Sequence, residues 1–108
     1  MSVRVLEHIR DAMIREGIVR NTSEFCVGWL GKSECYIRTL RHSRLDASVD
    51  ALITCASKLN HYATRLEQSK SAQHISWAKQ MREHKMLCED AIERQARSKW
   101  MQPERMGA

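Results

Sequence analysis

The scarcity of residues that interrupt helices is the feature that most constrains the fold of this chain. Only one proline and four glycines occur among its 108 residues. Because these two residue types break helices, long uninterrupted helices are permitted almost everywhere. Strands need runs of β-branched and aromatic residues, and such runs are missing from a chain that is only 6% aromatic. The sequence therefore predicts an all-α protein.

Length and charge set further bounds on the protein. With 108 residues, of which 43% are hydrophobic, the chain can form one domain with a modest core, and it is too short for two. Its formal net charge of +5 at pH 7 is compatible with a polyanionic partner but does not require one.

The stretch over residues 23–43, SEFCVGWLGKSECYIRTLRHS, predicts two short helices that meet at Gly31. Glycine adopts positive φ at little steric cost, so the chain can turn sharply there. Ser23 and Ser33 are the candidate caps of the two helices, because a serine hydroxyl accepts a hydrogen bond from a free N–H group at a helix start. The apolar residues expected to pack behind the turn are Leu30, Ile37 and Leu40. This arrangement is that of a helix-turn-helix.

The opposite face of the second helix carries the candidate contacts to DNA bases. Its residues are Ser33, Glu34, Cys35, Arg38, Thr39 and His42. Arginine can make a bidentate pair with guanine, and threonine can meet the thymine methyl group. We therefore expect Arg38 and Thr39 to read bases, with the other four as secondary contacts. Glu34 can accept a hydrogen bond from cytosine, but an acid in a first helical turn also stabilises the helix dipole without any ligand.

Six residues around the motif are candidate contacts to DNA phosphates: Lys32, Arg41, Arg44, Tyr36, Ser48 and Arg20. Five of the six also have a role that needs no DNA. Arg41 and Arg44 suit the negative end of the helix dipole, and Ser48 can cap the next helix. The Tyr36 ring can pack in the core, and Arg20 can be an ordinary solvated side chain.

The motif resembles the helix-turn-helix of the lambda-repressor and Cro type. Leu30-Gly31-x-Ser33, followed by Ile37 and Leu40, is similar to the turn and recognition helix of that family. The residues that resemble its next helix are Ala47-Ser48, Leu52, Ala56 and Leu59, so the resemblance covers about residues 20–62. It implies a sequence-specific transcriptional regulator of bacterial or phage type that binds double-stranded DNA. A two-fold dimer of such proteins would recognise a palindromic site.

Two residues depart from the pattern of that family. Val27 stands where the family usually has alanine, at the close approach of the two helices, and Lys32 stands where an apolar residue is usual. Together with Glu34, these departures favour an alternative: a non-enzymatic protein interaction module, such as an adaptor or inhibitor, built on the same fold. A structural subunit whose basic surface is incidental is a third alternative.

Three further helices complete an expected five-helix domain. The first spans residues 3–16 and ends at Gly17. Another follows Ser48, and its expected core stripe is Val49, Leu52, Ile53, Ala56, Leu59, Ala63 and Leu66. The last spans residues 75–101. We expect a helix-turn-helix domain over residues 1–67, a long C-terminal helix over 68–102 within the same compact domain, and a frayed tail over 103–108.

The length of the last helix raises the question of what covers it. At 1.5 Å per residue it would be near 40 Å long, which exceeds what a small body can cover. Its apolar residues are Trp77, Ala78, Met81, Leu87, Cys88, Ala91 and Ile92. We expect them to pack against the first helix or against another chain, either in a homodimer or with a different protein partner.

Other chemistry finds little support in the sequence. His84 and Cys88 have a spacing that can hold zinc, but no second pair accompanies them, so we expect no metal and no cofactor. Phosphate-binding loops and paired catalytic carboxylates are missing, which argues against an enzyme. The scattered cysteines favour reduced thiols in a cytoplasmic protein, and no stretch approaches the ~20 apolar residues that a membrane span needs.

Overall fold

The computed structural model describes residues 2–106, which form six helices and no strand. The predicted all-α class, the five helices and the long C-terminal helix are confirmed, and a short sixth helix follows them. The helices are α1 (Ser2–Arg15), α2 (Thr22–Leu30), α3 (Tyr36–Ser43), α4 (Val49–Glu67), α5 (Ala72–Trp100) and α6 (Pro103–Met106).

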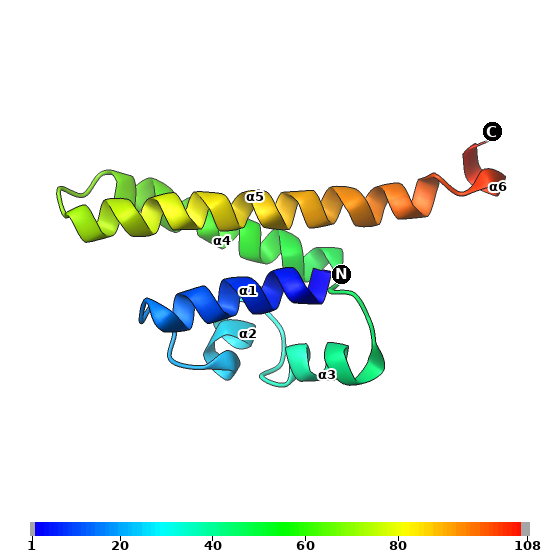
Figure 1. The fold of residues 1–108 in the computed structure, drawn as a ribbon, viewed down its shortest axis with the longest axis horizontal. Helices are drawn as coiled ribbons and strands as arrows, with labels where there is room; N and C mark the ends of the chain where they lie inside the picture. Colours follow the sequence, from blue (N-terminus) through cyan, green and yellow to red (C-terminus); the bar gives the residue numbers. More distant parts are fainter. Residues whose placement is uncertain (1, 107–108) are drawn as a thin grey trace.

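The hairpin of α4 and α5 is the largest unit of the fold. The two helices lie side by side with the most extensive helix–helix contact in the chain. α2 packs directly on α4, and α1 lies between α5 and α3 (Figure 1). Each helix of the hairpin starts at a serine cap, since Ser48 accepts from Ala51 N and Ser71 accepts from His74 N. With 29 residues, α5 measures about 43 Å, most of the 53 Å length of the molecule.

The core stripe of α4 differs from the prediction at one large residue. Leu52, Ala56, Leu59 and Ala63 are buried as expected, whereas Ile53 is 52% exposed. The stripe that meets α5 also contains Ala51 and Cys55, which places Ile53 on the opposite side of the helix. The small residues of this stripe allow the two helices to approach closely.

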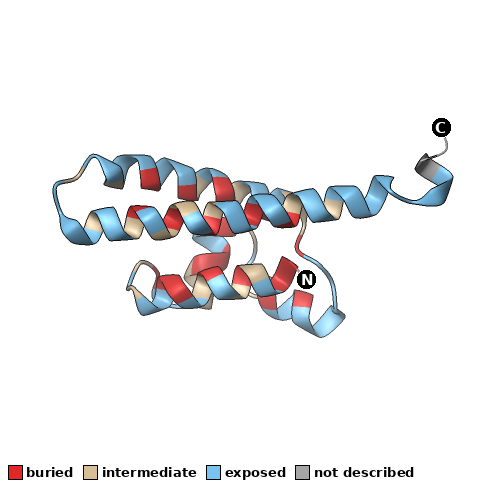
Figure 2. Ribbon diagram, turned by 45° about the horizontal axis from the view of Figure 1, so that its top comes forward, coloured by how far each residue is buried: buried red, intermediate tan, exposed pale blue. Residues whose placement is uncertain are grey.

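Within the chain, the last helix packs mainly on α4, a contact that the sequence analysis did not predict, and only to a smaller extent on α1. The buried residues of α5 are Ala78, Met81, His84, Cys88 and Ala91. α1 covers a smaller part, where Trp77 Nε1 donates to Glu16 Oε2 at 3.3 Å. Leu87, expected in the stripe, is 37% exposed. Figure 2 shows buried positions along the inner sides of the helices and an exposed C-terminal end of α5.

The bend at Gly31 is present as predicted. Gly31 has φ +66°, in the left-handed region, and the N–H groups of Gly31 and Lys32 both donate to Cys26 O. Behind it, Leu30, Ile37 and Leu40 are buried. Gly17, with φ +77°, follows the end of α1 in the same way.

The predicted serine caps of the motif are wrong. Asn21, not Ser23, caps α2, because its side chain accepts from Glu24 N at 2.9 Å. α3 begins only at Tyr36, after Cys35, and has no side-chain cap. Ser33 and Glu34 therefore lie in the turn before α3, where Glu34 is not a first-turn acid. Asparagine is as good a cap as serine, so the sequence alone did not decide between them.

The C-terminal tail is partly helical. Pro103–Met106 form α6 where a frayed tail was expected, and residues 107–108 of that prediction lie outside the described residues. Among residues 2–106, no helix combines the length and the apolar composition needed to cross a bilayer.

The two glycines of the motif respond oppositely to alanine. At Gly31 an added Cβ would meet Thr54 Cγ2 at an ordinary 3.7 Å, so Gly31→Ala is expected to destabilise only through its positive φ, by about 1–2 kcal/mol. Gly28 lies inside α2, and there an added Cβ would meet Lys58 Nζ at 3.8 Å. Gly28→Ala should therefore stabilise by about 0.5–1 kcal/mol. Urea unfolding of both variants measures the two signs, and equal effects would contradict the turn geometry.

His84 is a titratable group in the core, and its burial was not predicted from the sequence. It is 7% exposed, its Nδ1 has no hydrogen-bond partner among the described residues, and its ring lies edge-on to His8 with centroids 5.7 Å apart. Burial lowers the pKa of His84 below the ordinary 6.5, and the nearby His8 and Arg15 lower this pKa further, against an opposing effect of Glu83.

The buried His84 predicts a loss of stability in mild acid. Since the folded-state pKa is depressed, the unfolded chain takes up the proton first, and stability that is full above pH 6.5 decreases as the pH falls below it. The slope should be at most about 1.4 kcal/mol per pH unit for one proton. Urea unfolding between pH 7 and about pH 5, above the ordinary carboxyl range, should show a flatter profile for His84→Leu. Equal profiles would rule out His84 as the source.

Candidate nucleic-acid interface

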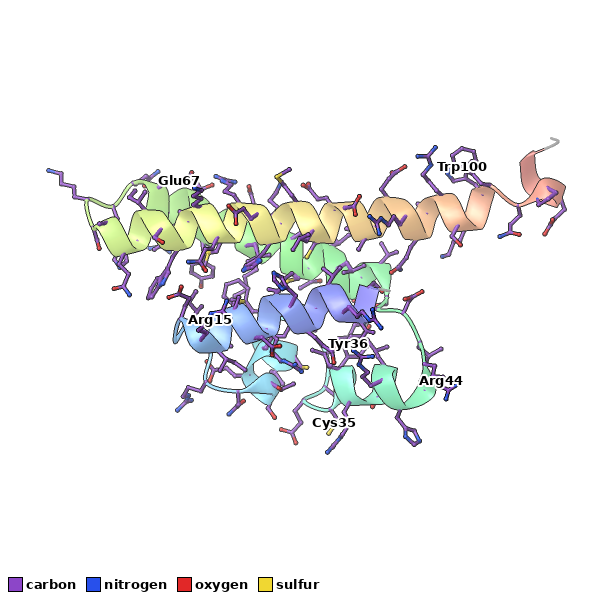
Figure 3. The ribbon with its side chains drawn as sticks, in the orientation of Figure 1. Arg15, Cys35, Tyr36, Arg44, Glu67 and Trp100 are labelled. Atoms are coloured by element: carbon purple, nitrogen blue, oxygen red, sulfur yellow. The ribbon has the colours of Figure 1, made fainter. Side chains whose placement is uncertain are left out.

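The outer face of α3 is a solvent-exposed surface, as the sequence predicted. Ile37 and Leu40 anchor the inner side of this eight-residue helix in the core. The residues exposed on or beside the outer face are Ser33, Glu34, Arg38, Thr39 and His42, and Cys35 is half-buried. α3 lies on the far side of α1 from α5, with Cys35 at its outer edge and Arg44 projecting beyond its end (Figure 3).

Arg38 and Arg44 are the two basic residues of this face without a carboxylate partner among the described residues. Arg38 Nη2 donates to Cys35 Sγ at 2.8 Å, one turn earlier in the chain. Arg44 ends α3 with φ +54°, an uncommon conformation for a residue with a side chain. Both guanidinium groups are exposed and can be offered to an anion.

Arg41 is held by α1. Its Nε donates to Glu7 Oε2 at 3.0 Å, and its Nη2 donates to Glu7 Oε1. These hydrogen bonds lower the pKa of the Glu7 carboxyl and raise the pKa of Arg41. The pair fastens α3 to α1 at the surface, so a phosphate would have to compete with Glu7 for Arg41.

Lys32 and Arg20 also have partners within the chain. Lys32 Nζ lies 3.1 Å from Asp50 Oδ2 and 5.7 Å from the ring centroid of Tyr36. Arg20 Nε lies 3.0 Å from Glu24 Oε2. Both ion pairs have an exposed member, and such pairs contribute little to stability and exchange readily.

Tyr36 and Ser48 have internal roles. Ser48 N donates to the Tyr36 hydroxyl at 2.9 Å, and this hydroxyl donates to Ser48 Oγ at 3.3 Å. Ser48 Oγ in turn accepts from Ala51 N as the cap of α4. The two residues thus link the starts of α3 and α4, and the predicted phosphate contacts would have to compete with this link.

A cleft of about 470 Å³ lies beside the outer face of α3, between α1, α2 and α3. It is lined by Glu7, Arg10, Thr22, Ser23, Glu34, Cys35, Ile37, Arg38 and Arg41. Arg10, Thr22 and Ser23 had not been assigned to the interface from the sequence. Arg10 reaches this cleft only because α1 packs across α3, and no local pattern signals that contact.

A family model matches residues 6–101, nearly the whole chain, under the description "Family of unknown function (DUF6626)". The chain belongs to this family. No curated protein and no solved structure matches it.

The helix pair of this DUF6626 member departs from the lambda-repressor pattern at Val27. In that pattern a small residue lies where the two helices approach, whereas Val27 is 57% exposed here. The contact between α2 and α3 is small, and α3 packs more extensively on α1. Five residues, 31–35, separate the two helices.

In the described part of the chain, Cys88, the cysteine with a zinc-like spacing to His84, belongs to no metal-binding cluster. No three His, Cys, Asp or Glu side chains gather there as a metal site would require. Cys88 is instead in contact with Cys55 in the core, and a hydrogen bond from the Cys55 thiol lowers the pKa of Cys88.

Replacing Tyr36 tests its internal role. Tyr36→Phe leaves Ser48 N without its acceptor, while Ser48 Oγ still accepts from Ala51 N, and we expect a loss of about 1–2 kcal/mol in the free energy of unfolding. Urea unfolding followed by circular dichroism measures it. An unchanged stability would mean that the hydroxyl is free for another partner, as the sequence had suggested.

Proposed function

We propose that this protein binds double-stranded DNA through the outer face of α3, as a transcriptional regulator of bacterial or phage type. The observation that carries the proposal is the position of Arg38. Its guanidinium is exposed in the first turn of α3, and no carboxylate among the described residues neutralises it. An arginine so placed matches the bidentate acceptors of guanine in a major groove.

The surroundings of Arg38 suit a polyanion. Arg44 and His42 flank it, and Arg10 and Arg41 border the adjacent cleft. Three carboxylates lie close by: Glu34 and Glu7 line the cleft, and Asp11 holds Arg10. The face is thus only moderately basic, so base contacts and the net charge of +5 have to act together.

Each exposed residue has a proposed role. Arg38 and Thr39 contact bases, Arg44 contacts a phosphate, and Arg41 does so when a phosphate replaces Glu7. The secondary base contacts are Ser33, Glu34, Cys35 and His42. Lys32 and Arg20 remain phosphate contacts at the edge of the face, because their ion pairs are exposed on at least one side.

Fluorescence anisotropy with a random duplex at low salt tests the proposal. Arg44→Ala removes one phosphate contact, so the slope of log affinity against log salt should decrease by about 0.9. Arg38→Ala should weaken binding and reduce the preference among duplex sequences by about 1–3 kcal/mol. Glu34→Gln should strengthen binding, because it removes a negative charge from the face.

Lys79→Ala is the matched control. Lys79 is an exposed base on α5, so its loss changes the net charge equally but should leave the affinity and its salt slope nearly unchanged. If the wild type fails to bind at low salt, or if Lys79→Ala weakens binding as much as Arg38→Ala, the proposed interface is wrong.

A protein interaction module is the second candidate, and the engagement of basic residues favours it. Arg41 is held by Glu7, Lys32 by Asp50, and Arg20 by Glu24. Two exposed apolar residues also lie near this face: Val27 precedes the turn, in α2, and Leu45 follows α3. If the anisotropy experiment shows no duplex binding at all, the protein interaction module becomes the proposed function.

A further inference from the structure

The C-terminal part of α5 is not covered by the rest of the fold. From Glu93 to Trp100 the residues are exposed except for the half-buried Gln95. The end of α5 extends past α1 and α4, and Trp100 projects away from the body (Figures 1 and 3). About two turns at the end of α5 are thus largely open to solvent, although Gln95 Nε2 is hydrogen-bonded to Ala47 O.

Four exposed residues of α5 and the exposed residue at its C-cap form one stripe, which we call the α5 seam. They are Leu87, Asp90, Arg94, Arg97 and Met101. Successive members are alternately three and four residues apart, which is the spacing that keeps side chains on one face toward a partner helix. The two apolar members, at the ends of the seam, are 37% and 44% exposed.

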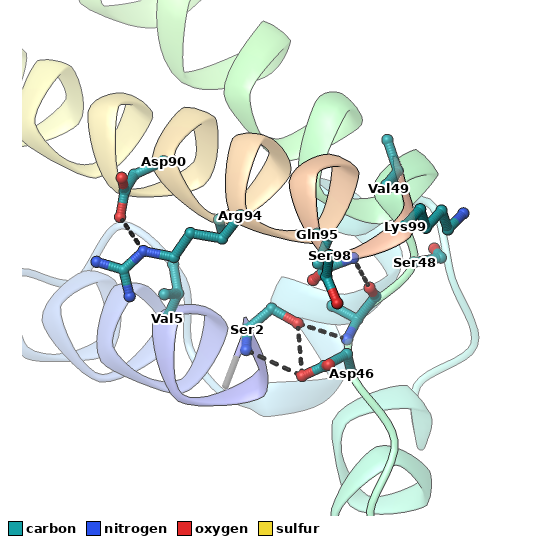
Figure 4. Close-up of a pocket in the computed structure, with 12 residues that line it drawn as sticks. Ser2, Val5, Asp46, Ser48, Val49, Asp90, Arg94, Gln95, Ser98 and Lys99 are labelled. Atoms are coloured by element: carbon teal, nitrogen blue, oxygen red, sulfur yellow. Dashed lines mark hydrogen bonds and ion pairs between the residues drawn. The ribbon is translucent and has the colours of Figure 1, made fainter. Parts of the chain in front are cut away.

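The seam borders an open groove of about 610 Å³ between α5, the start of α1 and the chain before α4 (Figure 4). Asp90 and Arg94 lie on its edge, with Asp90 Oδ2 and Arg94 Nε 3.0 Å apart. On the groove floor, Gln95 Nε2 donates to Ala47 O at 2.9 Å, while Gln95 Oε1 has no partner among the described residues. Nothing within the described chain fills this groove.

The charges along the seam are complementary to those of a second copy of the helix that runs in the opposite direction. An acid, Asp90, lies toward one end and a base, Arg97, toward the other, with Arg94 at the centre. When two such helices pack antiparallel about Arg94, Asp90 of each copy meets Arg97 of the other to within one residue. Leu87 of each copy then meets Met101 of the other. In a parallel pair, by contrast, like charges lie level with each other.

Local ion pairing does not oppose this arrangement. Arg97 Nε is 3.9 Å from Glu93 Oε1, at the limit of an ion pair, so it is available to a second carboxylate. Arg94, at the two-fold axis, is already neutralised by Asp90 of its own chain.

We propose that the α5 seam is the docking surface for a second copy of this chain, packed antiparallel in a two-fold dimer. The contact would cover the groove and the exposed end of α5. Because α3 lies on the other side of α1, both outer faces of α3 would stay open in the dimer (Figure 1). The proposal concerns a different surface from the proposed DNA contact, and neither depends on the other.

Reciprocal charge reversal tests the dimer in the full-length chain. Sedimentation should show that the wild-type mass rises with concentration from one chain to two. Asp90→Arg places arginines opposite each other, and Arg97→Asp places acids opposite each other, so each variant alone should dimerise about ten-fold more weakly or worse. An equimolar mixture of the two variants should restore the dimer, since each acid then faces a base again.

Matched controls separate the seam from general charge effects. Glu89→Arg changes the charge as Asp90→Arg does and also removes an i,i+4 partner of a basic residue, Lys85, but both residues lie off the seam. Lys79→Asp is the counterpart of Arg97→Asp. Both controls should dimerise like the wild type. The proposal is overturned if the wild type stays a single chain at all concentrations, if the controls weaken the dimer equally, or if the mixture does not restore it. DNA binding by α3 is measured separately, so either result stands without the other.

Discussion

The packing of α4 against α5 is the interaction on which the rest of the structure depends. Both helices bury small residues that are at most 6% exposed: Ala51 and Ala63 on α4, and Ala78 and Ala91 on α5. Close approach of the two backbones lets larger neighbours such as Leu52, Leu59 and Met81 interdigitate in the same core. The short N-terminal helices then have a long, rigid surface to pack on.

The position of α3 follows from this arrangement. A helix of eight residues is too short to be stable by itself, so tertiary contacts must hold it. Ile37 and Leu40 supply the buried contacts, the Arg41–Glu7 pair ties the helix to α1, and the Tyr36–Ser48 hydrogen bonds tie it to the start of α4. The inner half of α3 is thereby used for structure. The outer half of α3, centred on Arg38, is the surface that a partner can bind.

Local patterns in the sequence predicted the helices well. The features that the sequence did not predict depend on tertiary contacts between helices. Gly31, Leu30, Ile37 and Leu40 were identifiable because a glycine turn and helical spacing are local signals. Ile53 was misplaced, since an apolar residue beside a stripe can lie on either side of it. The Glu7–Arg41 pair, the place of Arg10 in the cleft and the burial of His84 depend on how α1 crosses α3 and α5, which no single helix encodes.

A titration of the 15N-labelled protein with duplex DNA, followed by amide NMR, tests the central claim most directly. If the outer face of α3 binds the duplex, the largest shifts should fall on residues 33–44 and on the start of α2, while the amides of α5 remain nearly unchanged. Shifts confined to α5, or no shifts at low salt, would contradict the account.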